Sequence, residues 1–256
     1  MTRRILSLLF WIFLVVSSLL LFPVALLIWL VTVPFDRKLS LLHQFTCFWA
    51  SLYTWLNPVW RVRVEGREKI RPGAAYVMVA NHQSMLDILV LFRLFAHFKW
   101  VSKIENFRVP CIGWNMWLNR YIPLRRGSRE SVAQMMLMCE DRLREGSSIM
   151  MFPEGTRSRD GRLQAFKPGA FTLAQRSQLP LLPIVVEGTS KALPKRGFVL
   201  QGRFPIRVRV LDEIPYGEFA NQPVEAVMES VRNRFAKELG EPTSVAPPLA
   251  RDATAR

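Results

Sequence analysis

The sequence predicts an α/β fold with a mainly parallel sheet flanked by helices, preceded by N-terminal membrane-associated helices. Two features of the 256-residue chain indicate this fold. The first part of the chain is almost continuously apolar, as is typical of a membrane anchor. In the remainder, short apolar runs alternate with stretches of helical periodicity. We therefore expect an anchor over residues 1–58, an α/β domain over residues 59–240 and a disordered tail over residues 241–256.

The anchor begins with an apolar segment from Ile5 to Val33 that contains no charged residue. As a single helix it would be about 44 Å long, which exceeds the ~30 Å hydrocarbon core of a bilayer. Pro23 lies inside this segment and is the natural place for a bend. Two alternatives remain for residues 5–33, namely one kinked or tilted span and a hairpin that turns back.

A second apolar stretch, residues 39–56, completes the expected anchor. Polar residues interrupt it, and it carries Trp49, Tyr53 and Trp55. This composition suits an amphipathic helix that lies at the level of the lipid headgroups. A helix buried in the core of the protein would have a similar pattern, so both interpretations stay open.

Seven strands and four longer helices are expected in the α/β domain. The strands are Trp60–Val64, Ala74–Ala80, Phe98–Ser102, Tyr121–Leu124, Ser148–Phe152, Leu181–Val186 and Ile206–Leu211. The helices are Met85–Phe95, Arg129–Glu145, Gly169–Gln178 and Val224–Leu239. Such alternation favours parallel strands joined by helices.

The formal net charge of +15 favours anionic partners. The basic residues are scattered along the chain and no nucleic-acid-binding motif is present, so a membrane surface is a better partner than nucleic acid. The three cysteines, Cys47, Cys111 and Cys139, are far apart in the sequence. Their number and spacing indicate neither a disulfide framework nor a metal site, and a reducing compartment is the simplest interpretation.

A candidate general base lies in the segment Asn81-His82-Gln83-Ser84-Met85-Leu86-Asp87. His82 follows a predicted buried strand, and open α/β sheets usually carry their chemistry at the carboxyl ends of strands. Asp87 could orient the imidazole. Alternatively, Ser84 and Asp87 form a capping box at the start of the next helix, which would make Asp87 purely structural.

A second candidate segment, Phe152-Pro153-Glu154-Gly155-Thr156-Arg157-Ser158, also follows a predicted strand and should lie at the same edge of the sheet. Gly155 allows close approach of the backbone to a ligand, while Thr156 and Arg157 are suited to a phosphate group. The alternative is a solvated basic turn. The chain has no G-x-S-x-G, H-E-x-x-H, Walker or G-x-G-x-x-G motif, so serine-hydrolase, zinc-peptidase and nucleotide-binding functions lack support.

These two segments resemble the first and third signature blocks of the glycerolipid acyltransferase family, in particular its 1-acyl-sn-glycerol-3-phosphate acyltransferases. Residues 103–126 resemble the second block, from Lys103-x-Glu105 to the Arg125-Arg126 pair, and residues 179–184 resemble the fourth. The second block departs from the family pattern, because an Ile-Asp-Arg sequence is usual where this chain has Leu124-Arg125-Arg126. The four blocks occur in family order, which makes the resemblance specific.

The resemblance implies transfer of a fatty acyl group from acyl-CoA or acyl-carrier protein to the sn-2 hydroxyl of lysophosphatidic acid, which makes phosphatidic acid. His82 would be the general base and Asp87 would orient it. The resemblance also implies a set of residues that bind the phosphate and glycerol of the substrate. They are Lys103, Arg125, Arg126, Glu154, Gly155, Thr156 and Arg157, with the choice between the two neighbouring arginines left open.

Pro183 and Ile184 are expected to contribute to the acyl-donor or acyl-chain site. No metal and no cofactor other than the acyl co-substrate is expected. The expected location is a membrane, namely a bacterial inner membrane, with the catalytic domain facing the cytoplasm. The alternatives are another lysolipid acceptor such as lyso-ornithine lipid, a non-catalytic lipid-binding protein, and a hydrolase that uses His82 to activate water.

Overall fold

The computed structural model describes residues 2–57, 59–195 and 197–243. The expected disorder of the tail therefore falls, beyond residue 243, outside the described residues. The strands are β1 (Trp60–Glu65), β2 (Val77–Ala80), β3 (Phe98–Lys103), β4 (Ile122–Leu124), β5 (Ser148–Met151), β6 (Leu181–Glu187) and β7 (Phe204–Val210). The α-helices are α1 (Thr2–Thr32), α2 (Ser40–Trp55), α3 (Leu86–Leu91), α4 (Ile112–Leu118), α5 (Arg129–Arg144), α6 (Gly169–Ser177), α7 (Thr189–Ala192), α8 (Tyr216–Phe219) and α9 (Val224–Leu239).

The seven strands form one sheet in the order β1-β7-β6-β2-β5-β3-β4. Neighbouring strands are parallel except for β6 and β7, which are antiparallel. The expectation of a mainly parallel sheet flanked by helices is therefore confirmed. β2 lies in the middle of this sheet, so the segment that follows it is surrounded by other strand ends.

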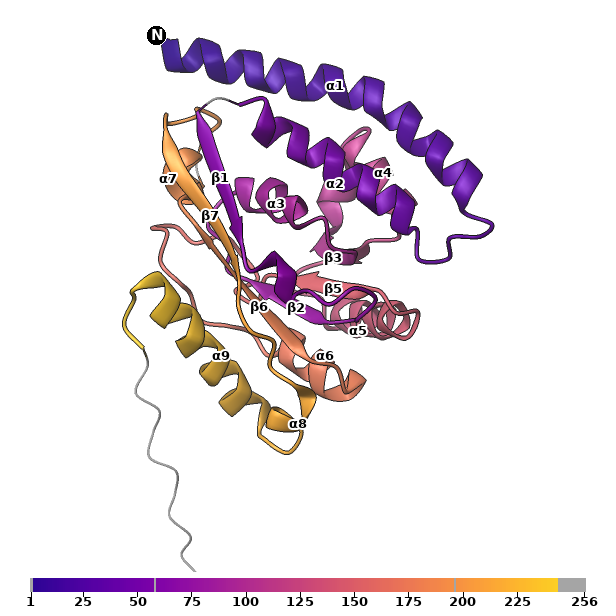
Figure 1. Cartoon of the computed structure of the whole chain (residues 1–256), viewed down its shortest axis with the longest axis vertical. Coiled ribbons are helices and arrows are strands. Elements are labelled where there is room, and N and C mark those ends of the chain that lie inside the picture. Colours follow the sequence, from indigo (N-terminus) through magenta and orange to yellow (C-terminus); the bar gives the residue numbers. More distant parts are fainter. Residues whose placement is uncertain (1, 58, 196, 244–256) are drawn as a thin grey trace, which may run out of the picture.

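Alternate residues of the central strands face the two sides of the sheet, as the period of two requires. Met78 and Ala80 of β2 pack in the hydrophobic cluster that includes residues of α2 and α3, whereas Val77 and Val79 pack with α5, α6 and α9. Figure 1 shows these two helical layers on opposite sides of the sheet. The central strands β2, β5 and β6 are buried on both faces, which explains their nearly continuous apolar sequences.

Helix α1 is continuous from Thr2 to Thr32, with Pro23 inside it, so the hairpin alternative is not formed. It runs alongside α2 (Figure 1), and the Ser17 hydroxyl lies 3.0 Å from the Tyr53 hydroxyl of α2. Most of its large apolar side chains are exposed. By length and composition α1 could cross a membrane.

Helix α2 has many buried residues, while Leu41, Phe48 and Trp55 are exposed, so features of both interpretations of residues 39–56 are present. The ring of His43 contacts the Tyr121 hydroxyl through Nδ1 at 2.9 Å and the Ala96 carbonyl through Nε2 at 2.9 Å. Burial lowers the pKa of His43 well below its ordinary value, which keeps this imidazole neutral. Helix α2 is thus packed into the α/β domain and also supports α1.

Candidate active site

The loop that carries His82 is attached firmly to the middle of the sheet. Asn81 follows β2, and its side chain makes two hydrogen bonds with Val186 of the neighbouring strand β6. Its Nδ2 donates to the Val186 carbonyl at 2.8 Å, and its Oδ1 accepts from the Val186 N–H at 2.7 Å. An asparagine amide can replace a backbone peptide in this way, because it offers one donor group and one acceptor. These two hydrogen bonds fix Asn81 to the sheet and thereby fix the position of the next residue, His82.

His82 and Asp87 form a buried pair. Nδ1 of His82 donates to Oδ2 of Asp87 at 2.8 Å. The imidazole also stacks on the Phe152 ring, with ring centroids 3.9 Å apart. Oδ1 of Asp87 accepts a hydrogen bond of 2.5 Å from the Thr189 hydroxyl. These contacts fix the ring in orientation and place the proton on Nδ1, so that Nε2 is the nitrogen that can accept a proton.

Asp87 also makes the contacts of a helix cap. Its Oδ2 accepts hydrogen bonds from the backbone N–H groups of Gln83 at 2.6 Å and Ser84 at 2.7 Å. The Ser84 hydroxyl donates to the Leu193 carbonyl at 2.6 Å. The two interpretations of this segment are therefore compatible, because the same carboxylate stabilises the turn and orients His82.

Glu154, which follows β5, joins the two candidate segments. Its Oε1 accepts from the His82 backbone N–H at 2.7 Å, and its Oε2 accepts from the Gln164 N–H at 3.1 Å. A further bond runs from the Ser158 N–H to the His82 carbonyl at 2.8 Å. Burial raises the pKa of Glu154 to about 7. The hydrogen bonds from the two N–H groups act in the opposite direction and lower this pKa, but their effect is smaller. Since both its oxygens accept from backbone groups, Glu154 positions the two loops relative to each other.

Glu154 should make stability depend on pH. Because its folded-state pKa is raised, the folded protein keeps a proton that the unfolded chain loses between about pH 4.5 and 7. The free energy of unfolding should therefore fall through this window, by an amount on the order of 2 kcal/mol. Glu154→Gln should lack this fall. Denaturant titrations of both proteins from pH 5 to 8 measure it, and parallel pH profiles would show that the expected titration does not occur.

An apolar cavity of ≈ 490 Å³ opens beside His82. Its walls come from α1, α2, α3 and α4 and from β3 and β5. Lys103 and Arg126 are the cations that line it, and Lys103 pairs with Glu105 at 3.1 Å. Most of the remaining wall is formed by apolar and aromatic residues, among them Phe10, Trp11, Leu14, Trp49, Tyr53 and Leu89.

The structure brings together only part of the expected site. Gly155 lines the apolar cavity with His82, while Thr156 and Arg157 lie beside it in the same loop without lining it. Both arginines of the pair are exposed, and only Arg126 lines the cavity. Arg126 is therefore the arginine of the pair that a ligand in the cavity would meet.

Pro183 and Ile184 are not brought to the cavity. Both are buried within β6, where they pair with Val79 and Ala80 of β2. Neither is among the residues that line the apolar cavity or a second, polar cavity in the described part of the chain. Their contribution is to hold β2 in the sheet.

Sequence reasoning missed Lys167 as a neighbour of the site. Gly155 has a φ of 70°, and a Cβ built on it would lie 3.0 Å from Nζ of Lys167. The glycine therefore provides both the left-handed backbone and the space for this ammonium group. The position of Lys167 just before Pro168 and α6 was the available signal, because a cation there adds to the anion-binding tendency of a helix N-terminus.

The fold and the site define a class of α/β enzymes in which a His–Asp pair at the end of a central strand faces an apolar cavity with cations in its wall. Residues 61–187 match the family model described as Acyltransferase.

Three relatives illustrate the similarity. The chain is 37% identical over 218 residues to a 1-acyl-sn-glycerol-3-phosphate acyltransferase of Chlamydomonas reinhardtii, which covers 83% of this chain and 64% of the relative. It is 35% identical to a chloroplastic protein of the same name from Brassica napus, over 80% of this chain and 58% of the relative. The Saccharomyces cerevisiae protein of that name is 35% identical over 70% of this chain and 60% of the relative. The chain thus spans less than two thirds of these relatives.

A solved structure has the same fold. It is the crystal structure of the 1-acyl-sn-glycerophosphate acyltransferase PlsC from Thermotoga maritima, with a TM-score of 0.73 and 22% sequence identity. The match covers 95% of this chain and all of that chain. It extends over the N-terminal helices as well as the sheet.

Proposed function

We propose that the protein transfers a fatty acyl group from acyl-CoA or acyl-carrier protein to the sn-2 hydroxyl of lysophosphatidic acid, and so makes phosphatidic acid. The observation that carries this proposal is the buried His82–Asp87 pair facing an apolar cavity lined by Lys103 and Arg126. The cavity suits a fatty chain and the cations suit a phosphate. The names of the similar proteins support this acceptor.

In the proposed reaction, Nε2 of His82 accepts the proton of the acceptor hydroxyl while its oxygen bonds to the thioester carbon. Asp87 stabilises the imidazolium that forms, because its carboxylate already accepts the hydrogen bond from Nδ1. The tetrahedral intermediate then expels the thiolate, which takes the proton back from Nε2. Since the thiolate is a good leaving group, the reaction needs no covalent acyl-enzyme.

The acceptor phosphate would be bound by Lys103 and Arg126, with Lys167 and Arg157 in neighbouring positions. Glu154 would hold the loop of His82 against the loop of Gly155. The proposed phosphate-binding cations lie around this second loop. This arrangement places the phosphate at the cavity wall and leaves the interior of the cavity for the acyl chain.

The neighbouring arginines allow a matched test. Arg126→Ala is expected to raise the KM for lysophosphatidic acid about tenfold, because a charge-assisted hydrogen bond to phosphate is lost. Arg125→Ala removes the same charge one position earlier, outside the cavity, and is expected to change this KM less than about threefold. Steady-state assays with varied acceptor compare the two variants. Equal effects would show that net charge, rather than the position of Arg126, determines acceptor binding.

The N-terminal helices would hold the enzyme on the membrane in which its lipid substrate and product reside. Trp114 of α4 packs on Phe22 of α1, so these helices form one unit. Large apolar side chains are exposed on α1, α2 and α4, including Leu8, Leu19, Leu27, Phe48, Trp114 and Trp117. We place the α/β domain on the cytoplasmic side of the membrane, for which the three free, buried cysteines give support.

The acceptor itself is tested by a panel assay. The purified full chain in detergent receives oleoyl-CoA with lysophosphatidic acid, lyso-ornithine lipid or lysophosphatidylcholine, and the products are identified by mass. The proposal predicts the highest kcat/KM for lysophosphatidic acid. A preference for lyso-ornithine lipid, which has no phosphate, would contradict the assigned acceptor while leaving acyl transfer intact.

A further inference from the structure

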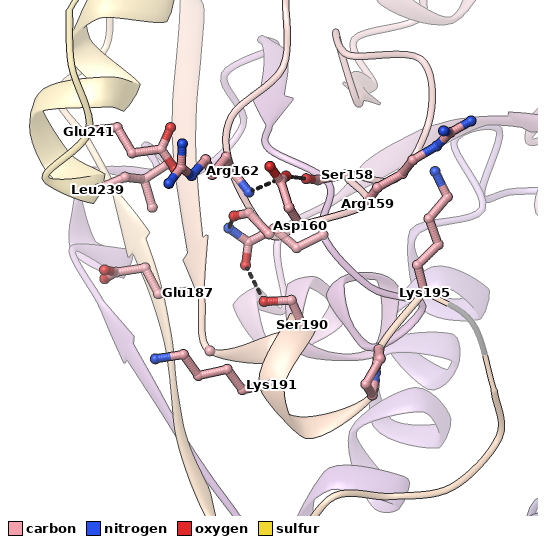
Figure 2. Close-up of a pocket in the computed structure, with 14 residues that line it drawn as sticks. Ser158, Arg159, Asp160, Arg162, Glu187, Ser190, Lys191, Lys195, Leu239 and Glu241 are labelled. Atoms are coloured by element: carbon pink, nitrogen blue, oxygen red, sulfur yellow. Dashed lines mark hydrogen bonds between the residues drawn. The ribbon is translucent and has the colours of Figure 1, made fainter.

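A second cavity, of ≈ 370 Å³, is polar and lies on another side of the catalytic loops. The loop over residues 158–162, the end of β6 with α7, and the end of α9 form its walls, as Figure 2 shows. No residue of α1 or α2 lines it, whereas both helices line the apolar cavity. A water-soluble ligand can therefore reach the polar cavity without passing the membrane-associated helices.

The two cavities are neighbours, because consecutive residues of the chain line one cavity and then the other. His82 lines the apolar cavity and the next residue, Gln83, lines the polar one. The same holds for Leu193 and Pro194. Nε2 of the Gln83 amide donates to the Gly161 carbonyl at 2.8 Å, which fixes this wall. A ligand in the polar cavity would thus lie close to the proposed general base.

The carboxylates of the polar cavity are already engaged by the protein. Their donors are the Ser158 hydroxyl and the Arg162 N–H for Asp160, the Arg209 guanidinium for Glu187, and the Leu163 N–H for Glu241.

Among the described residues, four cations line the polar cavity, and two of them, Arg159 and Lys195, lie apart from Glu187 and Glu241, whereas Arg162 and Lys191 lie on the same side as these carboxylates. Arg159 has no hydrogen bond or ion pair with any described residue, and Lys195 donates to the Arg157 carbonyl. In Figure 2 the Arg159 and Lys195 side chains extend to the side of the cavity away from Glu187 and Glu241. That side therefore presents positive charge to the cavity, which is the condition for binding an anion such as a phosphate ester.

We propose that the polar cavity binds a phosphate group on the carrier of the acyl donor, the phosphopantetheine group found in both coenzyme A and acyl-carrier protein, through Arg159 and Lys195. This inference rests on the proposed function, because it assigns a place to the second substrate of that reaction. The acceptor phosphate is already matched by Lys103 and Arg126 in the apolar cavity. The donor phosphate thus needs a separate set of cations.

The arrangement explains how two anionic substrates meet at one base. The lipid acceptor enters from the membrane side, and the soluble donor is bound from the polar side. The pantetheine arm is long and flexible, so it can lead from a phosphate in the polar cavity across the Gly155–Ser158 loop to a thioester at His82.

The test compares variants of the full chain in detergent with two donors, oleoyl-CoA and oleoyl-phosphopantetheine. Arg159→Ala is expected to raise the KM for oleoyl-CoA about tenfold, and Arg159→Lys by less. Lys195→Gln removes a charge but keeps a donor for the Arg157 carbonyl, and should raise this KM about threefold to tenfold. The KM for lysophosphatidic acid should not change. Arg61→Ala, which removes an exposed cation of β1, is the control and should leave the donor KM unchanged.

The two donors identify the phosphate. If Arg159→Ala weakens both donors, the phosphate of the phosphopantetheine group is bound, as proposed. If it weakens only oleoyl-CoA, the nucleotide phosphates are bound instead, which would contradict the assignment to the phosphopantetheine group. An unchanged KM for both donors, or a change only for the acceptor, would overturn it.

A binding experiment separates this proposal from the proposed function. If the unaltered protein fails to transfer acyl groups at all, the proposed function fails. Isothermal titration with coenzyme A alone still tests the cavity, since Arg159→Ala should weaken that binding about tenfold. Equal binding by both proteins would overturn the inference independently of turnover.

Discussion

Replacing His82 with alanine is expected to lower kcat for acyl transfer about 10³-fold, because no other described side chain is placed to accept the hydroxyl proton at this cavity. The loss should appear in kcat rather than in the KM of either substrate, since His82 acts in the transition state. Acyl transfer is followed by thiol release in the presence of lysophosphatidic acid, and the thermal midpoint of each protein is measured in parallel.

His97→Gln is the matched control for this experiment. His97 contacts the Ser147 hydroxyl through Nε2 at 2.9 Å and does not line the apolar cavity. Burial lowers its pKa to about 4, so a neutral glutamine replaces a neutral imidazole. This variant should retain transfer. If His82→Ala also retained transfer, the His82 segment would be only a capped turn.

Asp87→Asn is expected to lower kcat by about 10²- to 10⁴-fold. An amide cannot accept the hydrogen bonds from His82 Nδ1 and from the Gln83 and Ser84 N–H groups as a carboxylate does, so the imidazole would lose its tautomer and orientation. Kinetics of the single variant and of the double variant with His82→Ala test this role.

The double variant separates the two functions of Asp87. If Asp87 acts through His82, the double variant should be about as slow as His82→Ala alone, because residues that act as a unit are not additive. Additive losses in kcat would assign Asp87 a role independent of the base. A fall in thermal midpoint without a loss of kcat would reduce Asp87 to its capping role.

The sheet was predictable because β2, β5 and β6 are apolar and buried on both faces, while β1 and β7 alternate between buried and exposed residues. All seven predicted strands are present, and Val224–Leu239 forms a helix with the predicted ends. Short elements were missed, since α4 and α7 lie between turns and have too few residues to show a helical period. The predicted helix Met85–Phe95 divides into α3 and a 3₁₀ turn, because Phe95 adopts a left-handed conformation that ends it.

The contact between His82 and Asp87 was predictable for a different reason. His82 and Asp87 are close in sequence, and a single turn brings them together. The cavity is formed by segments far apart in the chain, so its walls from α1 and α2 had no local signal. The sequence also could not show which of the two neighbouring arginines faces the cavity. Arg125 and Arg126 are the same residue type, and only the fold of the loop directs Arg126 to the cavity wall. Pro183 and Ile184 matched a signature block whose residues serve the sheet.

Acceptor-dependent thiol release from oleoyl-CoA by the purified, detergent-solubilised full chain tests the central claim most directly. The account predicts that thiol appears only when lysophosphatidic acid is present, and that phosphatidic acid forms in equal amount. Thiol release without the acceptor, with free fatty acid as the product, would instead show that water takes the acyl group and would contradict acyl transfer to a lipid hydroxyl.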